Sequence, residues 1–142
     1  MPPAPPAQQG HIQAAEFIGP IYFWGQGAAI DYPRAMAAYK VGAEGGIAGC
    51  QFQVSTMYHE GLGVAVDYKQ ARLWIEKAAA QDHPNAVATL GVMYFDEGNG
   101  VTPSWRRARE LWERASELGD SKAVKDLRSL NEAIPKVCPG WA

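Results

Sequence analysis

Cysteine is scarce in this chain of 142 residues, because Cys50 and Cys138 are the only two and they lie far apart in the sequence. Small secreted domains depend on a dense disulfide framework, which two distant cysteines cannot supply. The amino terminus, MPPAPPAQQG, also lacks the basic and apolar segments of a secretory signal. A cytoplasmic location is therefore expected.

Long apolar runs and charge of one sign are missing as well. The most apolar stretch, residues 17–30, is interrupted by Pro20, Gly25 and Gly27, so no membrane span is predicted. The formal net charge is only -2, which gives no large field that would attract nucleic acid or an acidic membrane surface.

Basic residues do gather between residues 106 and 128, but acidic residues are interleaved with them. Three pairs fall at i,i+4: Arg106 with Glu110, Arg109 with Glu113, and Glu110 with Arg114. A solvated, salt-bridged face is the favoured interpretation, and nucleic-acid binding, which would need an uncompensated stripe, is the less favoured alternative.

No pattern of catalytic or metal-ligating residues is present. His11, His59 and His83 are far apart, no HExxH pair occurs, and the two cysteines form no zinc motif. His59 next to Glu60 is better explained as a solvated pair than as a general base, because no nucleophile signature accompanies it. We therefore expect no cofactor, no metal and no enzymatic activity.

An internal repeat dominates what the sequence does contain. Tyr22, Tyr58 and Tyr94 are spaced by 36 residues, and a pair of glycines follows each tyrosine. After each glycine pair come, at matching offsets, a polar residue, an aromatic residue and an alanine, and the third copy has one extra residue in its glycine loop. The three sets are Asp31, Tyr32 and Ala35, then Asp67, Tyr68 and Ala71, then Ser104, Trp105 and Ala108.

Each copy has the pattern of a helical hairpin. Before the loop, apolar or small residues recur at i, i+4, i+7 and i+8, as in Cys50, Val54, Met57 and Tyr58. After the loop, Asp67 is placed to cap a second helix, and the glycines allow the chain to reverse at positive φ. A phosphate-binding loop is the alternative explanation of EGLGV and EGNGV, but no strand precedes the glycines and the required lysine is missing. Cys50 takes a small-residue core position, which predicts a buried and unreactive thiol.

The pattern A-x3-L-G-x-M-Y-x3-G-x-G-V-x2-D-x3-A-x2-W-x2-K-A-A resembles the Sel-one-like repeat (SLR) family, whose units are related to tetratricopeptide repeats. Residues 86–115, AVATLGVMYFDEGNGVTPSWRRARELWERA, carry it with one inserted loop residue and with Ser104 where aspartate is usual. The resemblance covers roughly residues 12–130. It implies an all-α fold, an α/α superhelical solenoid, and a role as an adaptor or scaffold.

The predicted organisation is a disordered Pro/Ala-rich tail at residues 1–10, a solenoid at 11–134 and a C-terminal tail at 135–142. About three helix-turn-helix repeats and a C-terminal capping helix are expected. Pro20 falls inside the first helix, which is therefore expected to be irregular or short. Asn131 takes the tyrosine position of the earlier copies, and this polar change suits a capping helix.

The sequence predicts a non-catalytic module that binds a protein or peptide along the concave solenoid surface. Trp24 stands where the second copy has Glu60, so its indole is a candidate anchor, although packing against the first helix explains it equally well. The predicted partner-binding residues are Trp24, His59, Glu60 and Phe95. The alternative is a structural subunit or a fragment of a longer array that acts through its terminal hairpins, and self-association is possible in either case.

Overall fold

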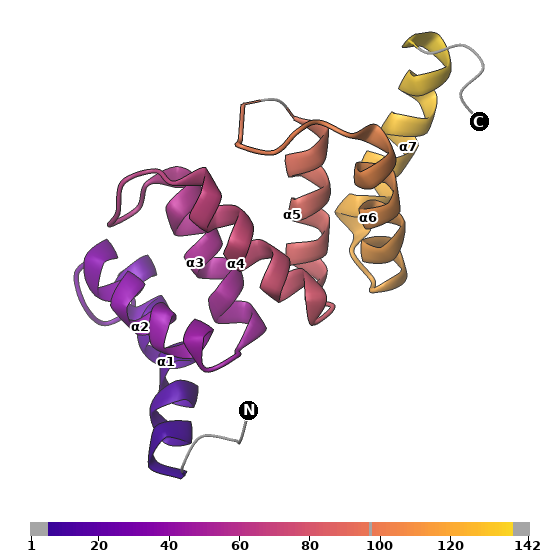
Figure 1. Ribbon diagram of the computed structural model, residues 1–142. Helices are drawn as coiled ribbons and strands as arrows, with labels where there is room; N and C mark the ends of the chain where they lie inside the picture. Colours follow the sequence, from indigo (N-terminus) through magenta and orange to yellow (C-terminus); the bar gives the residue numbers. More distant parts are fainter. Residues whose placement is uncertain (1–5, 97, 138–142) are drawn as a thin grey trace. The chain divides into compact units, whose positions relative to one another are not determined.

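The computed structural model describes residues 6–96 and 98–137, and the side chains of residues 10–96 and 98–133. Within these residues the chain forms seven α-helices and no strand, which confirms the all-α prediction (Figure 1). The helices are α1 (Pro6–Trp24), α2 (Tyr32–Glu44), α3 (Ala48–Glu60), α4 (Tyr68–Ala80), α5 (Pro84–Phe95), α6 (Trp105–Glu117) and α7 (Ser121–Val137).

Consecutive helices pair as hairpins. In a first compact unit, residues 1–81, α1 packs on α2 and α3 on α4, and α2 also packs on α3. In a second compact unit, residues 82–142, α5 packs on α6, and α6 also packs on α7. Three hairpins and a further helix are the composition that the repeat spacing predicts.

The predicted capping residue begins the second helix of every hairpin. Asp31, Asp67 and Ser104 accept a hydrogen bond from the backbone N–H three residues later, over 3.1, 3.1 and 3.3 Å. The backbone N–H of each capping residue also donates to the carbonyl of the repeat's tyrosine, as Asp67 does to Tyr58 over 2.9 Å. The loop between the tyrosine and the capping residue contains two glycines at positive φ in each repeat: Gly25 and Gly27, Gly61 and Gly63, and Gly98 and Gly100.

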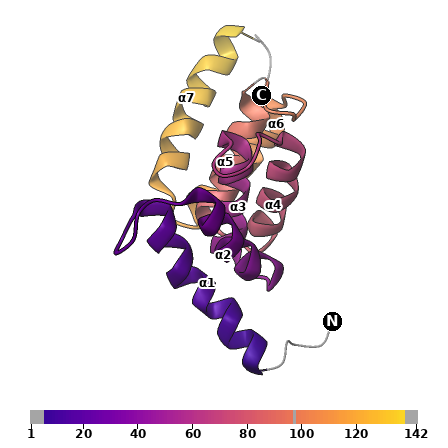
Figure 2. The ribbon, with the colours of Figure 1, turned by 90° about the vertical axis from the view of Figure 1, so that its left-hand side faces the viewer.

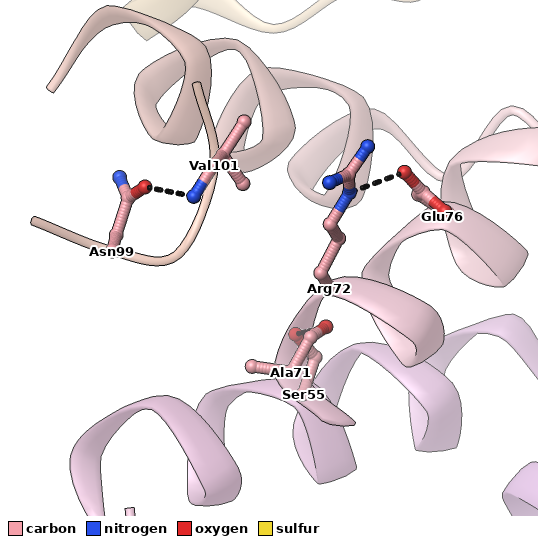
Figure 3. Close-up of polar contacts among 6 residues, drawn as sticks. All are labelled: Ser55, Ala71, Arg72, Glu76, Asn99 and Val101. Carbon is pink, nitrogen blue, oxygen red and sulfur yellow. Dashed lines mark hydrogen bonds and ion pairs between the residues drawn. The ribbon is translucent and has the colours of Figure 1, made fainter. Parts of the chain in front are cut away.

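A small residue lies where the two helices of each hairpin cross. At Gly91, a Cβ atom would lie 2.5 Å from Nε1 of Trp112, whose N–H donates to the carbonyl of Ala88 over 3.1 Å. In the second hairpin the same repeat position is Ser55, and its hydroxyl donates to the carbonyl of Ala71 over 2.6 Å (Figure 3). The two helices therefore approach closely in both hairpins, and at Ser55 a hydrogen bond reinforces the contact.

The core of the first unit draws buried side chains from α1, α2 and α3. Cys50, Val54 and Met57 on α3 are fully buried, together with Ala35 and Tyr39 on α2. Burial raises the pKa of the Cys50 thiol to about 11, and the nearby carboxylate of Glu16 adds to the rise. The thiol is thus protonated and enclosed at neutral pH, as predicted for a structural cysteine.

The first helix differs from its prediction. It begins at Pro6, so residues 6–10 are helical and do not belong to a disordered tail, and it continues through Pro20 over 19 residues. Prolines are tolerated in the first turn of a helix, where the missing N–H has no partner to lose. At Pro20 the lost hydrogen bond belongs to the carbonyl of Glu16, a residue exposed to solvent, while Ala15, Gly19 and Phe23 hold the opposite face buried. The last helix also passes the predicted end of the solenoid and stops at Val137, whereas Cys138 and Trp141 lie outside the described residues.

Substitution of Gly91 by alanine tests the close crossing of α5 and α6. We expect Gly91→Ala to lower the free energy of unfolding by about 1–3 kcal/mol, because the added methyl group overlaps the Trp112 ring. The matched control is Gly49→Ala in α3, where a Cβ meets nothing within 4 Å and should stabilise the helix by about 0.5–1 kcal/mol. Urea unfolding followed by circular dichroism measures both, and equal effects of the two substitutions would contradict the crossing.

The start of α5 is capped by a titratable residue. Nδ1 of His83 accepts the backbone N–H of Ala86 over 3.2 Å, and burial lowers the pKa of His83 below its ordinary value. Only the neutral imidazole can accept this bond. Protonation of His83 therefore works against folding.

Acidification should destabilise the protein through His83. The pKa of His83 is lower in the folded state than its value of about 6.5 in the unfolded state, so below about pH 6.5 the unfolded state binds more protons. The contribution of neutral His83 to the free energy of unfolding is therefore complete above that pH and is lost as the pH falls toward the folded pKa. His83→Asn keeps a capping acceptor without this titration. Urea unfolding at a series of pH values should show a smaller loss for His83→Asn than for the wild type below about pH 6.5, and equal losses would exclude His83 as the cause.

A candidate binding groove formed by α5, α6 and α7

The predicted partner-binding residues lie at the ends of the first helices of the hairpins. Trp24 ends α1 and is exposed, with its ring 4.7 Å from that of Phe23 in an edge-to-face contact. His59 and Glu60 end α3, and the His59 ring lies 5.2 Å from that of Tyr68. These three residues belong to the first unit, whereas Phe95 ends α5 in the second unit.

Phe95 lines a groove of about 390 Å³ in the second unit. Its ring lies 5.6 Å from that of Trp112, which is buried in α6, and Leu130 of α7 is buried beside the same space. Pockets that hold small ligands or side chains begin at roughly 300 Å³. The floor is apolar, and the complete lining is Val92, Phe95, Asp96, Trp112, Lys122, Asp126, Ser129, Leu130 and Ala133.

One face of α7 forms a wall of this groove. Lys122, Asp126, Ser129 and Ala133 line it and follow one another at i, i+4, i+7 and i+11, which places them in a row along the helix. The lining contains two carboxylates, Asp96 and Asp126, and one ammonium group, that of Lys122. The groove therefore combines an apolar floor with an excess of negative charge at its edge.

The loop that follows α5 is held in place by Asn99. Its side-chain amide donates to the carbonyl of Met93 over 2.9 Å, and its oxygen accepts the backbone N–H of Val101 over 3.2 Å (Figure 3). Asn99 is buried and Val101 packs in the core. These bonds tie Asn99 and Val101 to the end of α5, the helix that carries Phe95.

Of the residues that line this groove, Phe95 is the one that the sequence predicted to bind a partner. The residues between 106 and 128 were interpreted as a solvated, salt-bridged face, which is confirmed for α6: Arg109 pairs with Glu113 over 3.0 Å. Glu110 pairs with Arg107 over 3.6 Å, and Arg114 with Asp82, in place of the other two expected pairs. The signal that could have revealed the groove is the spacing of Lys122, Asp126 and Ser129 on the face of α7 next to Leu130.

None of the described helices has both the length and the apolar character needed to cross a membrane. Within the described ranges, no group of three or more histidine, cysteine, aspartate or glutamate side chains is arranged to hold a metal ion.

The hairpins coincide with the repeats of a known family. The Sel1 repeat family model matches residues 12–47, 48–83 and 84–120, which contain α1 with α2, α3 with α4, and α5 with α6. These matches cover well over half of the chain, so the chain belongs to the Sel1 repeat family. Repeats of this family generally serve as non-catalytic protein-interaction modules.

Curated relatives are much longer than this chain. It is 28% identical over 131 residues to the ERAD-associated E3 ubiquitin-protein ligase component HRD3A of Arabidopsis thaliana, covering 92% of this chain but 17% of that protein. It is 36% identical over 70 residues to an exopolysaccharide production negative regulator of Rhizobium leguminosarum bv. viciae, covering 49% of this chain and 26% of the regulator.

Solved structures share the fold. The crystal structure of c5321, a protective antigen of uropathogenic Escherichia coli with an SLR fold, superimposes with a TM-score of 0.79 at 36% identity, over 85% of this chain and 26% of the antigen. A Sel1 repeat protein from Oxalobacter formigenes gives 0.79 at 32% identity, over 87% of this chain and 50% of that one. Cysteine rich protein B of Helicobacter pylori matches in fold, with a TM-score of 0.69 at 20% identity, over 85% of this chain and 92% of that one.

Proposed function

We propose that this chain is a non-catalytic interaction module that binds a protein or peptide partner, and that the groove formed by α5, α6 and α7 accepts an anchor side chain of that partner. The groove is the observation that carries the proposal. It is lined by α5, the first helix of the third repeat, and by α6 and α7, and we take it to be part of the concave binding surface predicted from the sequence.

The chemistry of the groove defines the anchor. Phe95, Trp112 and Leu130 offer an apolar floor, and burial of one large apolar side chain there contributes about 1.5–3 kcal/mol. Asp96 and Asp126 at the edge favour a cation beside that side chain. The preferred ligand is accordingly a segment with a large apolar residue next to lysine or arginine.

The relatives are consistent with a role in assembly. HRD3A is named as a component of a ubiquitin ligase, which is a property of that protein, and the present chain spans a small part of its length. Trp24, His59 and Glu60 remain proposed contributors to partner binding through the first unit. A cytoplasmic location also remains a proposal.

Peptide selection from a displayed random library on the purified chain tests the groove directly. We expect enriched peptides to carry a large apolar residue flanked by a basic one, and to bind with micromolar affinity by fluorescence anisotropy. Ser129→Arg should weaken this binding at least about tenfold, equivalent to about 1.4 kcal/mol, because the guanidinium occupies the groove and pairs with its carboxylates.

Asn131→Arg is the matched control, since it makes the same charge change at an exposed residue of α7 that does not line the groove. Circular dichroism establishes that both variants keep the wild-type helix content. Peptides that bind wild type and Ser129→Arg equally would place recognition elsewhere, and a library that yields no specific peptide would contradict the proposed function.

A further inference from the structure

The groove formed by α5, α6 and α7 carries opposite charges at its two ends. Helix α7 runs along it in one direction, from a first turn that contains Lys122 to Ala133, about 16 Å further on (Figures 1 and 2). Helix α5 runs the same way in Figure 1 and ends just before Asp96, which corresponds to Ala133 one repeat of 37 residues earlier. A cation therefore lies at one end of the groove and a carboxylate at the other, since both residues line it.

Both charges lie where their own helices do not favour them. The dipole of a helix favours an anion at the first turn and a cation at the last turn. Lys122 lies in the first turn of α7, and Asp96 directly follows the last turn of α5. Neither charge forms an ion pair within the described residues, and Lys122 precedes Asp126 at i,i+4, the weaker order for such a pair. Charges that stabilise neither the helix nor a pair within the chain are typical of a binding site.

The first repeat shows which kind of side chain fits the floor between these charges. Phe23 takes in the first repeat the position that Phe95 takes in the third. The ring of Phe23 contacts the indole of Trp24 edge to face, with the centroids 4.7 Å apart, and Phe23 is only 8% exposed. In the third repeat Asp96 stands in place of Trp24, and Phe95 is 39% exposed. An aromatic ring supplied by a partner can contact Phe95 as Trp24 contacts Phe23.

From these observations we infer that the groove recognises an extended segment with an acidic, an aromatic and a basic residue at alternate positions, an inference that rests on the proposed function. Alternate residues of an extended segment point to one face, and five residues span about 13 Å, close to the length of the groove. The aromatic ring lies on Phe95 and Trp112. The acidic side chain pairs with Lys122 and the basic side chain with Asp96, while Asp126 disfavours a second acidic residue beside the ring.

The peptide acetyl-Glu-Ala-Trp-Ala-Arg-amide tests this order of charges, because its capped ends leave only side-chain charge. We expect nuclear magnetic resonance titration of the full chain to show binding that Ser129→Arg weakens. Lys122→Glu should weaken it about two- to fivefold, and should strengthen binding of acetyl-Lys-Ala-Trp-Ala-Arg-amide by a similar factor, as expected for an exposed ion pair. Asp96→Lys should likewise weaken the first peptide and strengthen acetyl-Glu-Ala-Trp-Ala-Glu-amide.

The control is Lys125→Glu, which makes the same charge change at an exposed residue of α7 that does not line the groove, and should leave all three affinities unchanged. Lys122→Glu and Asp96→Lys each place a charge that the helix end favours, so the fold should be kept, and circular dichroism verifies this.

Equal affinities of the wild-type chain for the three peptides overturn the inference, and so does a Lys122→Glu variant that keeps the wild-type order of preference. A chain that binds none of the three also overturns it. The displayed library decides the proposed function separately: selected peptides that lack this charge order, yet lose affinity for Ser129→Arg, overturn the inference and leave the proposed function standing.

Discussion

The fold depends on one residue at the start of each second helix. The backbone N–H of Asp67 donates to the carbonyl of Tyr58, which closes the loop onto the first helix, while the Asp67 carboxylate accepts the N–H of Gln70 and begins the second. Asp31 and Ser104 do the same in their hairpins. A single residue therefore links the two helices, through its backbone N–H to the first and its side chain to the second, and the glycines reach that geometry at positive φ.

With the loop fixed, the size of one side chain decides whether a second helix can pack. Gly19, Ser55 and Gly91 occupy this position in the three hairpins, and the corresponding residue of α7 is Arg128, 37 residues after Gly91. Arg128 is exposed, and a guanidinium chain there would block a helix from crossing α7 as α6 crosses α5. With this side chain, α7 packs on α6 but lacks the small residue that permits the close crossing of α5 and α6.

Local features that recur in each copy were predictable from the sequence: the tyrosine, the glycines of the loop and the capping residue. The course of α1 was not, because the rule that proline breaks helices considers only the hydrogen bond lost at Pro20, whereas the burial of Ala15, Gly19 and Phe23 holds that helix together. The sequence did not predict the groove, although it named one lining residue, Phe95, as a partner-binding candidate. Its other walls come from three helices, and their convergence depends on packing that no single stretch of sequence contains.

One wall of the proposed binding groove is α7, a helix with a face that does not pack on another helix of its unit. Helix α3 lies between α2 and α4 and must satisfy both, so Val54 and Met57 serve one neighbour while Ser55 serves the other. Within their own units, α1 packs chiefly on α2 and α7 on α6, which leaves a side of each free to vary without loss of the fold. The departures from the repeat occur on such helices: aromatic rings at Phe17 and Trp24, and charged residues at Lys122 and Asp126. We therefore expect partner recognition on helix faces that do not pack against another helix.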